Sequence, residues 1–246
     1  MPTAVITGAS QGLGRALTRA LAHRGWTLIV DARHADPLNA AVSGLEAVTA
    51  IPGDVTDPGH RDAIAAAIGP GGRLDLLVNN ASRLGPSPQP VLRSYPLSEL
   101  GDVFQTNVLA PLALIQLLAG PLTAAGGVVV NVSSDAAADA YPGWGGYGSA
   151  KAALDQLTAV LAAEEPGLSC YAFDPGDMRT AMHQRAFPGE DISDRPEPEV
   201  AAAALLRLLG QRPPSGRYRV GDYPEAGPGP ADQRDPASQQ SPAVTW

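Results

Sequence analysis

Tyr147 and Lys151 are the residues of this chain whose types and spacing most directly suggest chemistry. They stand four positions apart and are separated by the small residues Gly148, Ser149 and Ala150. In a helix, side chains at i and i+4 lie one above the other on the same face. A phenol and an ammonium held in this way are either an ordinary surface pair or an acid beside the cation that tunes it.

The size of the electrostatic effect favours a tuned acid. An unperturbed tyrosine has a pKa of about 10, and general acid–base catalysis works best with a pKa near the working pH. A shift of about 3 units requires roughly 4 kcal/mol. An ammonium about 4 Å away supplies about that much at an effective dielectric constant near 20. The spacing therefore predicts that Lys151 lowers the pKa of Tyr147.

An alternation of short apolar runs and longer amphipathic stretches must position this pair. The apolar runs predict strands over residues 3–7, 27–30, 48–51, 74–78, 127–132, 168–173 and 217–220. The stretches between them predict helices over residues 13–24, 37–44, 58–68, 97–118, 147–163 and 198–209. Most strand candidates are almost continuously apolar, as in strands covered on both faces, whereas the last alternates like an edge strand. Repeated βα units predict an α/β fold with a doubly wound parallel sheet and helices on both faces.

A glycine-rich turn joins the first strand to the first helix, in the order Gly8-Ala9-Ser10-Gln11-Gly12-Leu13-Gly14. A strand, a glycine turn and a helix together place a dinucleotide pyrophosphate on the N-terminus of the helix. The spacing is Gly-x3-Gly-x-Gly and differs from the Gly-x-Gly-x-x-Gly form. Because three glycines also occur in turns that bind nothing, the position directly after the first strand carries the argument.

The segment from Thr7 to Gly14 resembles the TGxxxGxG fingerprint of the short-chain dehydrogenase/reductase family, in its single-domain branch. Further motifs of that family follow in order almost to residue 221, nearly all at strand ends: Asp54-Val55, Asn79-Asn80-Ala81-Ser82, Asn107, Ser133-Ser134, Tyr147-x3-Lys151, and Pro175-Gly176 with Thr180. The resemblance implies a Rossmann-type fold with seven parallel strands. It also implies reversible hydride transfer between a nicotinamide cofactor and a carbonyl or alcohol.

The catalytic set that the resemblance implies is Asn107, Ser134, Tyr147 and Lys151. Tyr147 would be the general acid and base, and Ser134, at the family's usual offset from it, would orient the substrate oxygen. Lys151 would also bind the nicotinamide ribose. Asn107 would distort its helix and hold a water of the proton relay. From the residue type alone, a mid-helix Asn caps a kink or pairs with a backbone carbonyl, and both interpretations are compatible.

The cofactor-binding residues implied by the resemblance gather at the same strand ends. They are Thr7, Gly8, Ser10, Gln11, Gly12, Leu13, Gly14, Arg33, Asp54, Val55, Asn80, Ala81, Ser82, Tyr147, Lys151, Pro175, Gly176, Met178 and Thr180. Asp54 would meet the adenine amino group, although capping a helix or loop is the ordinary role of Asp in such a segment. Ser82 stands where the family usually has Gly.

The end of the second strand bears on the choice between NAD and NADP. Aligned on Gly25, the position of the family's NAD-selecting Asp is Ala32, and Arg33 stands where an Arg accommodates a 2′-phosphate. Asp31 is one residue away, and Gln11 occupies a position that is often basic in NADP-preferring members. The prediction is NADP(H), with NAD(H) as the alternative.

The substrate-binding residues expected beside Ser134 are Leu84, Tyr141, Trp144 and Met182, with Met178 and Phe187 nearby. They predict a largely apolar wall and a small hydrophobic or cyclic carbonyl or alcohol as substrate, although some of them could pack internally. Residues 180–198 are polar and Pro-rich, and they predict a loop or short helical lid over this pocket.

Two other functions compete with the enzyme. A non-catalytic, nucleotide-binding regulatory protein can use the same fold, but it has no need of the four catalytic residues together. A serine hydrolase would use Gly-x-Ser-x-Gly between a strand and a helix; Gly8-Ala9-Ser10-Gln11-Gly12 has this spacing, but it is part of the glycine turn of the family fingerprint and is therefore assigned to cofactor binding.

The composition excludes several classes of protein. Of the 246 residues 44% are hydrophobic, which allows a core, and the net charge of −8 argues against a nucleic-acid partner. The single cysteine permits no disulfide within the chain, and the four histidines show no metal-ligand spacing. Without a signal peptide or a long apolar run, we expect a cytoplasmic protein that does not span a membrane.

The predicted organisation is a single dinucleotide-binding and catalytic domain over residues 1–221. Residues 222–246 are rich in Pro and Gly and predict a disordered tail. The resemblance implies a homodimer or homotetramer that associates through the helices at 97–118 and 147–163.

Overall fold

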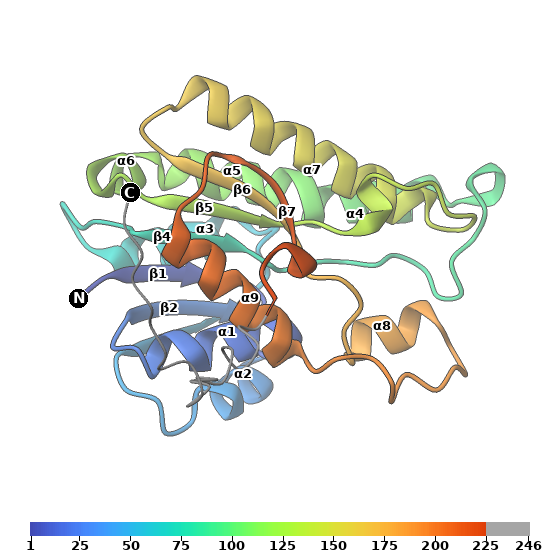
Figure 1. Ribbon diagram of the computed structural model, residues 1–246, viewed down its shortest axis with the longest axis horizontal. Helices are drawn as coiled ribbons and strands as arrows, with labels where there is room; N and C mark the ends of the chain where they lie inside the picture. The colour runs from blue at the N-terminus through green and yellow to red at the C-terminus, as the bar shows by residue number, and fades with distance from the viewer. Residues whose placement is uncertain (225–246) are drawn as a thin grey trace, which may run out of the picture.

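The computed structural model describes residues 1–224, and these contain a seven-stranded sheet in which every strand pair is parallel (Figure 1). The strands are β1 (Thr3–Ile6), β2 (Thr27–Ala32), β3 (Val48–Pro52), β4 (Leu76–Asn79), β5 (Val128–Val132), β6 (Ser169–Asp174) and β7 (Gly216–Arg219). Their order across the sheet is β3-β2-β1-β4-β5-β6-β7. The predicted doubly wound parallel sheet is confirmed, and its direction of winding reverses between β1 and β4, where such sheets bind ligands.

Helices cover both faces of the sheet (Figure 1). They are α1 (Gly12–Ala22), α2 (Ala35–Val42), α3 (Pro58–Ile68), α4 (Leu97–Phe104), α5 (Ala110–Leu117), α6 (Ala119–Ala125), α7 (Gly145–Glu164), α8 (Ala181–Ala186) and α9 (Pro198–Gln211). Short 3₁₀ turns η1 (Leu92–Ser94), η3 (Asp135–Ala137) and η4 (Val220–Asp222) and the π-helical turn η2 (Gln105–Leu109) complete the described elements.

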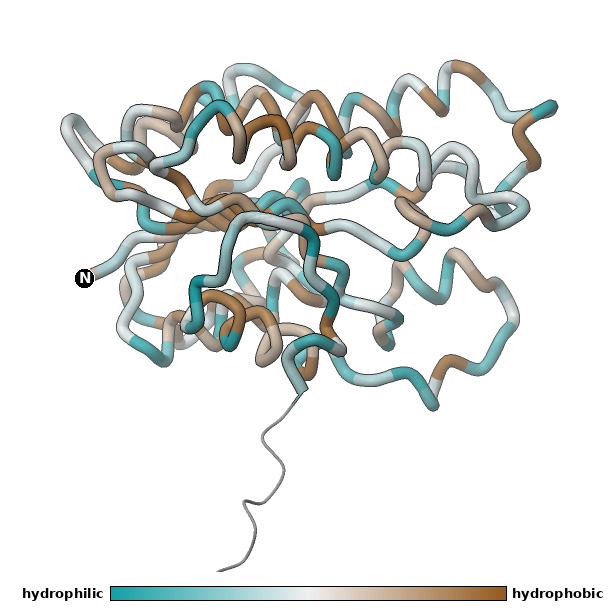
Figure 2. Tube along the Cα trace, turned by 45° about the horizontal axis from the view of Figure 1, so that its top comes forward, coloured by the Kyte–Doolittle hydropathy of each residue, from teal (hydrophilic) through white to brown (hydrophobic). Residues whose placement is uncertain are grey.

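The protein has two hydrophobic layers, because successive side chains of a strand point to opposite faces of the sheet. Val5 and Leu77 point to the face covered by α3, α5, α6 and α7, whereas their neighbours Ile6 and Val78 point to the face covered by α1, α2 and α9. The strands form the hydrophobic centre of the molecule between these layers (Figure 2). Because both faces are covered, the near-continuous apolar runs of the sequence become strands.

The predicted helix over 97–118 is one long stretch with a π-helical turn in its middle, at Gln105–Leu109. The stretch Leu97–Leu117 is long and apolar enough to cross a membrane by length and composition, although the sequence was expected to contain no such run. It lies against α7 and, through α5, against α3 as part of the layer that covers the sheet. Such covering helices satisfy the same criterion without a membrane.

Residues 180–198 contain a short helix, as one of the two predicted forms of this segment, whereas the start of the predicted tail differs from the structure. The helix is α8 (Ala181–Ala186), because the Thr180 hydroxyl accepts a hydrogen bond from the His183 backbone N–H and caps it. The tail was predicted from residue 222, yet Asp222 ends η4 and Tyr223 is buried against the core. Aromatic packing against Tyr218 accounts for the buried Tyr223. The rest of the predicted tail, residues 225–246, lies outside the described residues.

Candidate active site

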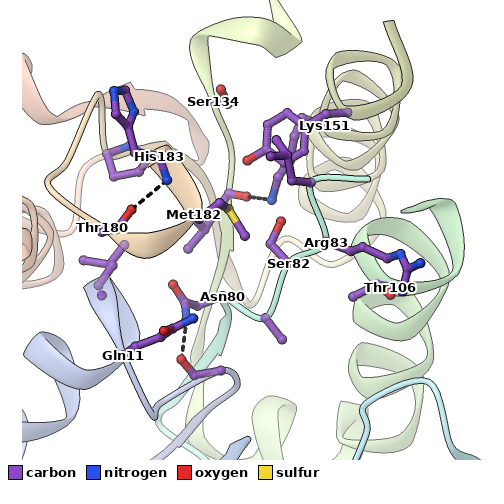
Figure 3. A pocket seen from close by; sticks show the side chains of 18 of the residues that line it. Gln11, Asn80, Ser82, Arg83, Thr106, Ser134, Lys151, Thr180, Met182 and His183 are labelled. Carbon is purple, nitrogen blue, oxygen red and sulfur yellow. Dashed lines mark hydrogen bonds between the residues drawn. The ribbon is translucent and has the colours of Figure 1, made fainter. Parts of the chain in front are cut away.

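A cleft of about 440 Å³ opens at the carboxyl ends of the strands, around the reversal of the winding. The parallel strands end at one edge of the sheet, so the turns that follow them meet there. Of the sequence-predicted residues, the cleft is lined by Gly8, Ser10, Gln11, Gly12, Leu13, Arg33, Asp54, Val55, Asn80, Ala81, Ser82, Leu84, Ser134, Trp144, Tyr147, Lys151, Pro175, Gly176, Met178, Thr180 and Met182. Figure 3 shows Ser82, Lys151 and Met182 near its centre, with Gln11 and Asn80 on the side of the glycine turn.

The glycine turn is shaped for close approach of a ligand to the backbone. Gly8 and Gly12 have φ of 69° and 55°, a region that favours glycine. A Cβ on Gly14 would overlap the Gly8 carbonyl oxygen, so this position admits no side chain. The Thr7 hydroxyl lies behind the turn and accepts hydrogen bonds from the Asn80 and Ala81 backbone N–H groups, at 2.9 Å each. Thr7 therefore joins the turns that follow β1 and β4.

The N-terminus of α1 is open to an anion. No side chain caps it, and its first turn contains no acidic residue. The first backbone N–H groups of a helix lack partners within the helix and carry its positive dipole end. Together with the glycine turn, this end fits the pyrophosphate of a dinucleotide.

The buried Asp31, near the end of β2, is hydrogen-bonded to the glycine turn. One carboxylate oxygen accepts a hydrogen bond from the Gly8 backbone N–H at 2.8 Å, and the other lies 2.9 Å from His60 Nε2. Asp31 is 1% exposed, and burial raises its pKa while His60 and Gly8 act in the opposite direction. Arg33 lines the cleft two residues further on. Asp31 lines the cleft as well, but both of its carboxylate oxygens already have partners within the protein.

Asp54 caps its own loop and also lines the cleft. It lines the cleft, and its Oδ1 accepts hydrogen bonds from Thr56 N at 2.9 Å and from Thr56 Oγ1 at 2.8 Å. Although partial burial acts in the opposite direction, these hydrogen bonds hold the pKa of Asp54 below its usual value. Asp54 caps its own loop and still borders the space beside Arg33.

Tyr147 and Lys151 project from the first turns of α7 into the cleft. Tyr147 is 9% exposed and Lys151 is 1% exposed, and Lys151 Nζ lies 5.5 Å from the centre of the Tyr147 ring. The ammonium donates a hydrogen bond to the Val132 carbonyl oxygen at 2.6 Å, at the end of β5. The pair is therefore not a surface pair.

The predicted direction of the pKa shift of Tyr147 is wrong. Burial raises the pKa of Tyr147 to about 12, the nearby Ser82 hydroxyl lowers it, and Asp174 and Asp135 raise it further. Burial also lowers the pKa of Lys151 to about 8, against the effect of Asp155. Removal of the two groups from water is the largest influence on both pKa values, and a prediction made for an exposed pair does not include it.

Ser134 follows the carboxyl end of β5, and its hydroxyl takes part in two local hydrogen bonds. It donates a hydrogen bond to Asp135 Oδ1 at 2.9 Å and accepts one from the Ala136 backbone N–H at 3.2 Å. Asp135 also lines the cleft, although sequence reasoning did not select it. Its position directly after Ser134 was the available signal.

Asn107 lies behind the cleft at the centre of the π-helical turn and is 0% exposed. Its side-chain amide donates to the Arg83 carbonyl oxygen at 2.9 Å and accepts from the Arg83 N–H at 2.8 Å. The expected distortion of the helix and the expected pairing with a backbone carbonyl both occur. Asn107 thereby holds the segment of Ser82, whose hydroxyl is 3.3 Å from the same amide oxygen.

The substrate end of the cleft is only partly as predicted. Leu84, Trp144 and Met182 pack together with Tyr147, and the Trp144 and Tyr147 rings meet edge to face with centroids 5.8 Å apart. Tyr141 is 44% exposed and is not among the lining residues, because the chain between η3 and α7 carries it outward. Phe187 also lies outside the lining and supports Trp144 from behind, at 5.7 Å between rings.

Charged side chains at this end were missed. Asp135, Asp174, Asp177 and His183 line the cleft beside the apolar residues. Asp174 is 4% exposed, and its Oδ1 accepts a hydrogen bond from the Gly176 N–H at 3.0 Å. This bond shapes the turn after β6, in which Gly176 has a φ of 65°. In the sequence, an aspartate before Pro-Gly is typical of a turn, so only the burial of Asp174 in the structure shows that it belongs to the site.

Comparison with known proteins gives a consistent match. The family model described as short chain dehydrogenase matches residues 2–191. The chain is 38% identical to the short chain dehydrogenase asqE of Emericella nidulans, over 66% of this chain and 64% of that one. It is 32% identical to gluconate 5-dehydrogenase of Gluconobacter oxydans, over 87% and 81%.

A solved structure shares both the fold and part of the sequence. The alcohol dehydrogenase of the archaeon Thermococcus sibiricus, in complex with 5-hydroxy-NADP, superposes with a TM-score of 0.79 at 28% identity. The superposition covers 89% of this chain and 95% of that one.

Proposed function

The chain belongs to the short-chain dehydrogenase family, and from that premise we propose that it interconverts a small carbonyl compound and its alcohol with NADP(H). Family membership supports an oxidoreductase that uses a nicotinamide dinucleotide. The observation that carries the proposal is the meeting of Tyr147, Lys151 and Ser134 with the glycine turn in one cleft. A protein that only bound a nucleotide would need the turn without the other three side chains.

The residues present fit the cofactor. The uncapped N-terminus of α1 and the turn around Gly8 and Gly12 would hold the pyrophosphate. Asp54 and Arg33 would hold the adenosine end, and Lys151 the nicotinamide ribose. When bound, the cofactor supplies or accepts the hydride and, in its oxidised form, adds a positive charge beside Tyr147.

The protein's own side chains would handle the proton and the substrate oxygen. Tyr147 would give its phenolic proton to the carbonyl oxygen during reduction and take it back during oxidation. Ser134 would hold that oxygen and stabilise its developing charge. To do so, its hydroxyl must turn from Asp135 toward the substrate. With the oxidised cofactor bound, the Lys151 ammonium, which is fixed on the Val132 carbonyl, would help to stabilise the phenolate, and Asn107 would keep the Ser82 segment in place.

The end of β2 supports the proposed preference for NADP(H). Asp31, the residue that raised the NAD alternative, also lines the cleft, but it is 1% exposed and each of its carboxylate oxygens already has a partner, Gly8 or His60. Arg33 borders the cleft and would meet a 2′-phosphate. The substrate is proposed only as a class: the apolar wall of Leu84, Trp144 and Met182 would take a largely apolar molecule.

We also propose a single catalytic domain over residues 1–221 and a homodimer or homotetramer. The helical faces expected to associate carry exposed apolar side chains, with Leu97 80%, Leu109 49% and Val160 41% exposed. In an assembly these side chains would be covered.

A paired experiment tests the proposal. Thermal stability is measured with NADP(H) and with NAD(H), and then the oxidation of an alcohol panel and the reduction of a ketone panel are followed by nicotinamide absorbance. We expect a larger thermal shift with NADP(H), and Arg33→Ala should reduce that preference. If neither cofactor stabilises the chain, the oxidoreductase proposal is wrong.

The catalytic assignment needs its own control. Tyr147→Phe should abolish turnover and keep cofactor binding, whereas Tyr141→Phe, which changes an exposed tyrosine outside the cleft, should keep both. Cofactor binding without turnover on either panel, in the wild-type chain, would instead support the nucleotide-binding regulator.

A further inference from the structure

The edge strand β7 directs one arginine toward the catalytic helix. Neighbouring side chains of a strand point to opposite faces. Tyr218 packs into the layer that contains Tyr171, with ring centroids 5.7 Å apart. Arg217 therefore points to the other face, where α7 lies. The strand that the sequence predicted at an edge of the sheet thus reaches the neighbourhood of the active site.

The Arg217 guanidinium binds three different elements at once. Its Nη2 donates to the Ser134 carbonyl oxygen at 2.8 Å and to Asp174 Oδ2 at 3.1 Å, and its Nε donates to Asp155 Oδ2 at 3.0 Å. These acceptors lie after β5, at the end of β6 and on α7. The side chains are largely buried, with 26% of Arg217, 18% of Asp155 and 5% of Asp174 exposed.

Each acceptor is adjacent to a residue of the proposed chemistry. The first is the backbone of Ser134 itself. Asp174 binds the Gly176 N–H with its other oxygen and so shapes the turn that lines the cleft. Asp155 follows Lys151 by four residues on α7, and four-residue spacing places both on one helix face.

The charges around the catalytic pair make Arg217 more than a structural clamp. Four polar groups surround Tyr147. Lys151 lies on the same helix, Asp174 on β6, and Asp135 and Ser82 in the turns after β5 and β4. Asp174 and Asp135 raise the pKa of Tyr147, and Asp155 raises that of Lys151. Arg217 is the cation bound to both Asp174 and Asp155.

We propose that Arg217 is a positioning residue of the active site, which fixes the Ser134 backbone and balances the two carboxylates that flank the Tyr147–Lys151 pair. The consequence for catalysis rests on the proposed function. The charge balance itself does not, because it is a property of the folded chain. The two parts are therefore separable by experiment.

The charge balance is tested on Lys151 without any substrate. Lys151 is the only lysine of the chain, so lysine-selective isotope labelling gives one side-chain NMR signal, whose titration reports its pKa. In Arg217→Met the carboxylates lose their counter-charge, and the midpoint of the titration should rise by about one unit, as for a nearby uncompensated charge. Arg219→Met removes an exposed guanidinium from the same strand and should leave the midpoint unchanged.

A double variant separates charge from damage to the fold. Arg217→Met combined with Asp155→Asn should bring the Lys151 midpoint back toward the wild-type value, because the uncompensated carboxylate is gone. A midpoint in Arg217→Met equal to that of the wild type overturns the proposal, as does a raised midpoint that Asp155→Asn leaves unchanged. If Arg217→Met does not fold, Asp155→Asn alone should lower the midpoint, and an unchanged value there is equally decisive.

The catalytic consequence is read from the pH profile of alcohol oxidation. In Arg217→Met the apparent pKa of the group that must be deprotonated should rise by about one unit, since Asp174 then opposes the phenolate more strongly. Arg217→Met/Asp174→Asn should reverse this rise. A lower kcat with an unmoved profile would reduce Arg217 to a structural role and overturn the proposal. Absence of any turnover in the wild type would contradict the proposed function, while the Lys151 titration still decides the charge balance.

Discussion

Replacing Lys151 with Met should make the cofactor-free protein more stable at neutral pH while it abolishes the proposed activity. Lys151 is 1% exposed, and burial lowers its pKa to about 8. The folded chain therefore stabilises the ammonium less than water does. Met has a similar length and carries no charge, so it removes this cost.

The magnitude follows from the shift. An unperturbed lysine has a pKa of about 10.4, so a folded value near 8 corresponds to a cost of about 3 kcal/mol at pH 7. The unfolded chain binds more protons than the folded chain between the two pKa values, so the stability of the wild type rises with pH in this window. At pH 10 the cost falls below about 1 kcal/mol. The lost hydrogen bond to the Val132 carbonyl subtracts about 1 kcal/mol from the gain at either pH.

Denaturant unfolding of both chains at pH 7 and pH 10 tests this reasoning. We expect Lys151→Met to exceed the wild type by roughly 2 kcal/mol at pH 7, with the advantage lost at pH 10. The difference between the chains is the relevant quantity, because Tyr147 and Cys170 have raised pKa values and titrate in the opposite sense. The NMR titration of the single lysine gives an independent midpoint, expected near 8.

A constant stability difference between pH 7 and pH 10 would refute the reasoning, because it would leave no contribution from proton binding. A Lys151 midpoint above 10 would refute it as well. Either result would mean that the ammonium is as well solvated in the fold as in water.

Three further predictions concern the glycine turn, the buried pair and the helical face. Gly14→Ala places a methyl group against the Gly8 carbonyl, and it should abolish the thermal shift caused by NADP(H) in a chain whose circular dichroism is unchanged. His60→Ala leaves the buried Asp31 without its partner and should cost roughly 2–3 kcal/mol in urea unfolding, with Asp31→Asn in addition recovering part of the loss. Leu109→Asp, at an exposed apolar position, should reduce the mass measured by light scattering to that of a smaller assembly; an unchanged mass would exclude this face.

Much of the site was predictable because its residues are local in the sequence. The turn from Gly8 to Gly14 requires glycine for reasons of backbone geometry, and the spacing of Tyr147 and Lys151 follows from one helical turn. The strand ends that carry Asp54, Asn80 and Ser134 were recognisable from apolar runs that stop. Such signals depend on neighbours along the chain.

The parts that were missed depend on burial and on distant contacts. Asp31 looked like a ribose ligand displaced by one residue, and only the structure shows that it is bonded to Gly8 and His60. Arg217 carried no signal, since its partners Ser134 and Asp174 lie 83 and 43 residues away. No local pattern encodes such contacts.

The sequence by itself determined the succession of βα units, the glycine turn and the spacing of the catalytic pair, because backbone conformation and side-chain periodicity are set by neighbouring residues. The tertiary structure alone decided the direction in which the pKa values of Tyr147 and Lys151 shift. It buries Tyr147 and Lys151 so deeply that their pKa values move away from the directions expected of an exposed pair. The cost of desolvation depends on everything packed around a group, and that is assembled only when the strands come together in the sheet.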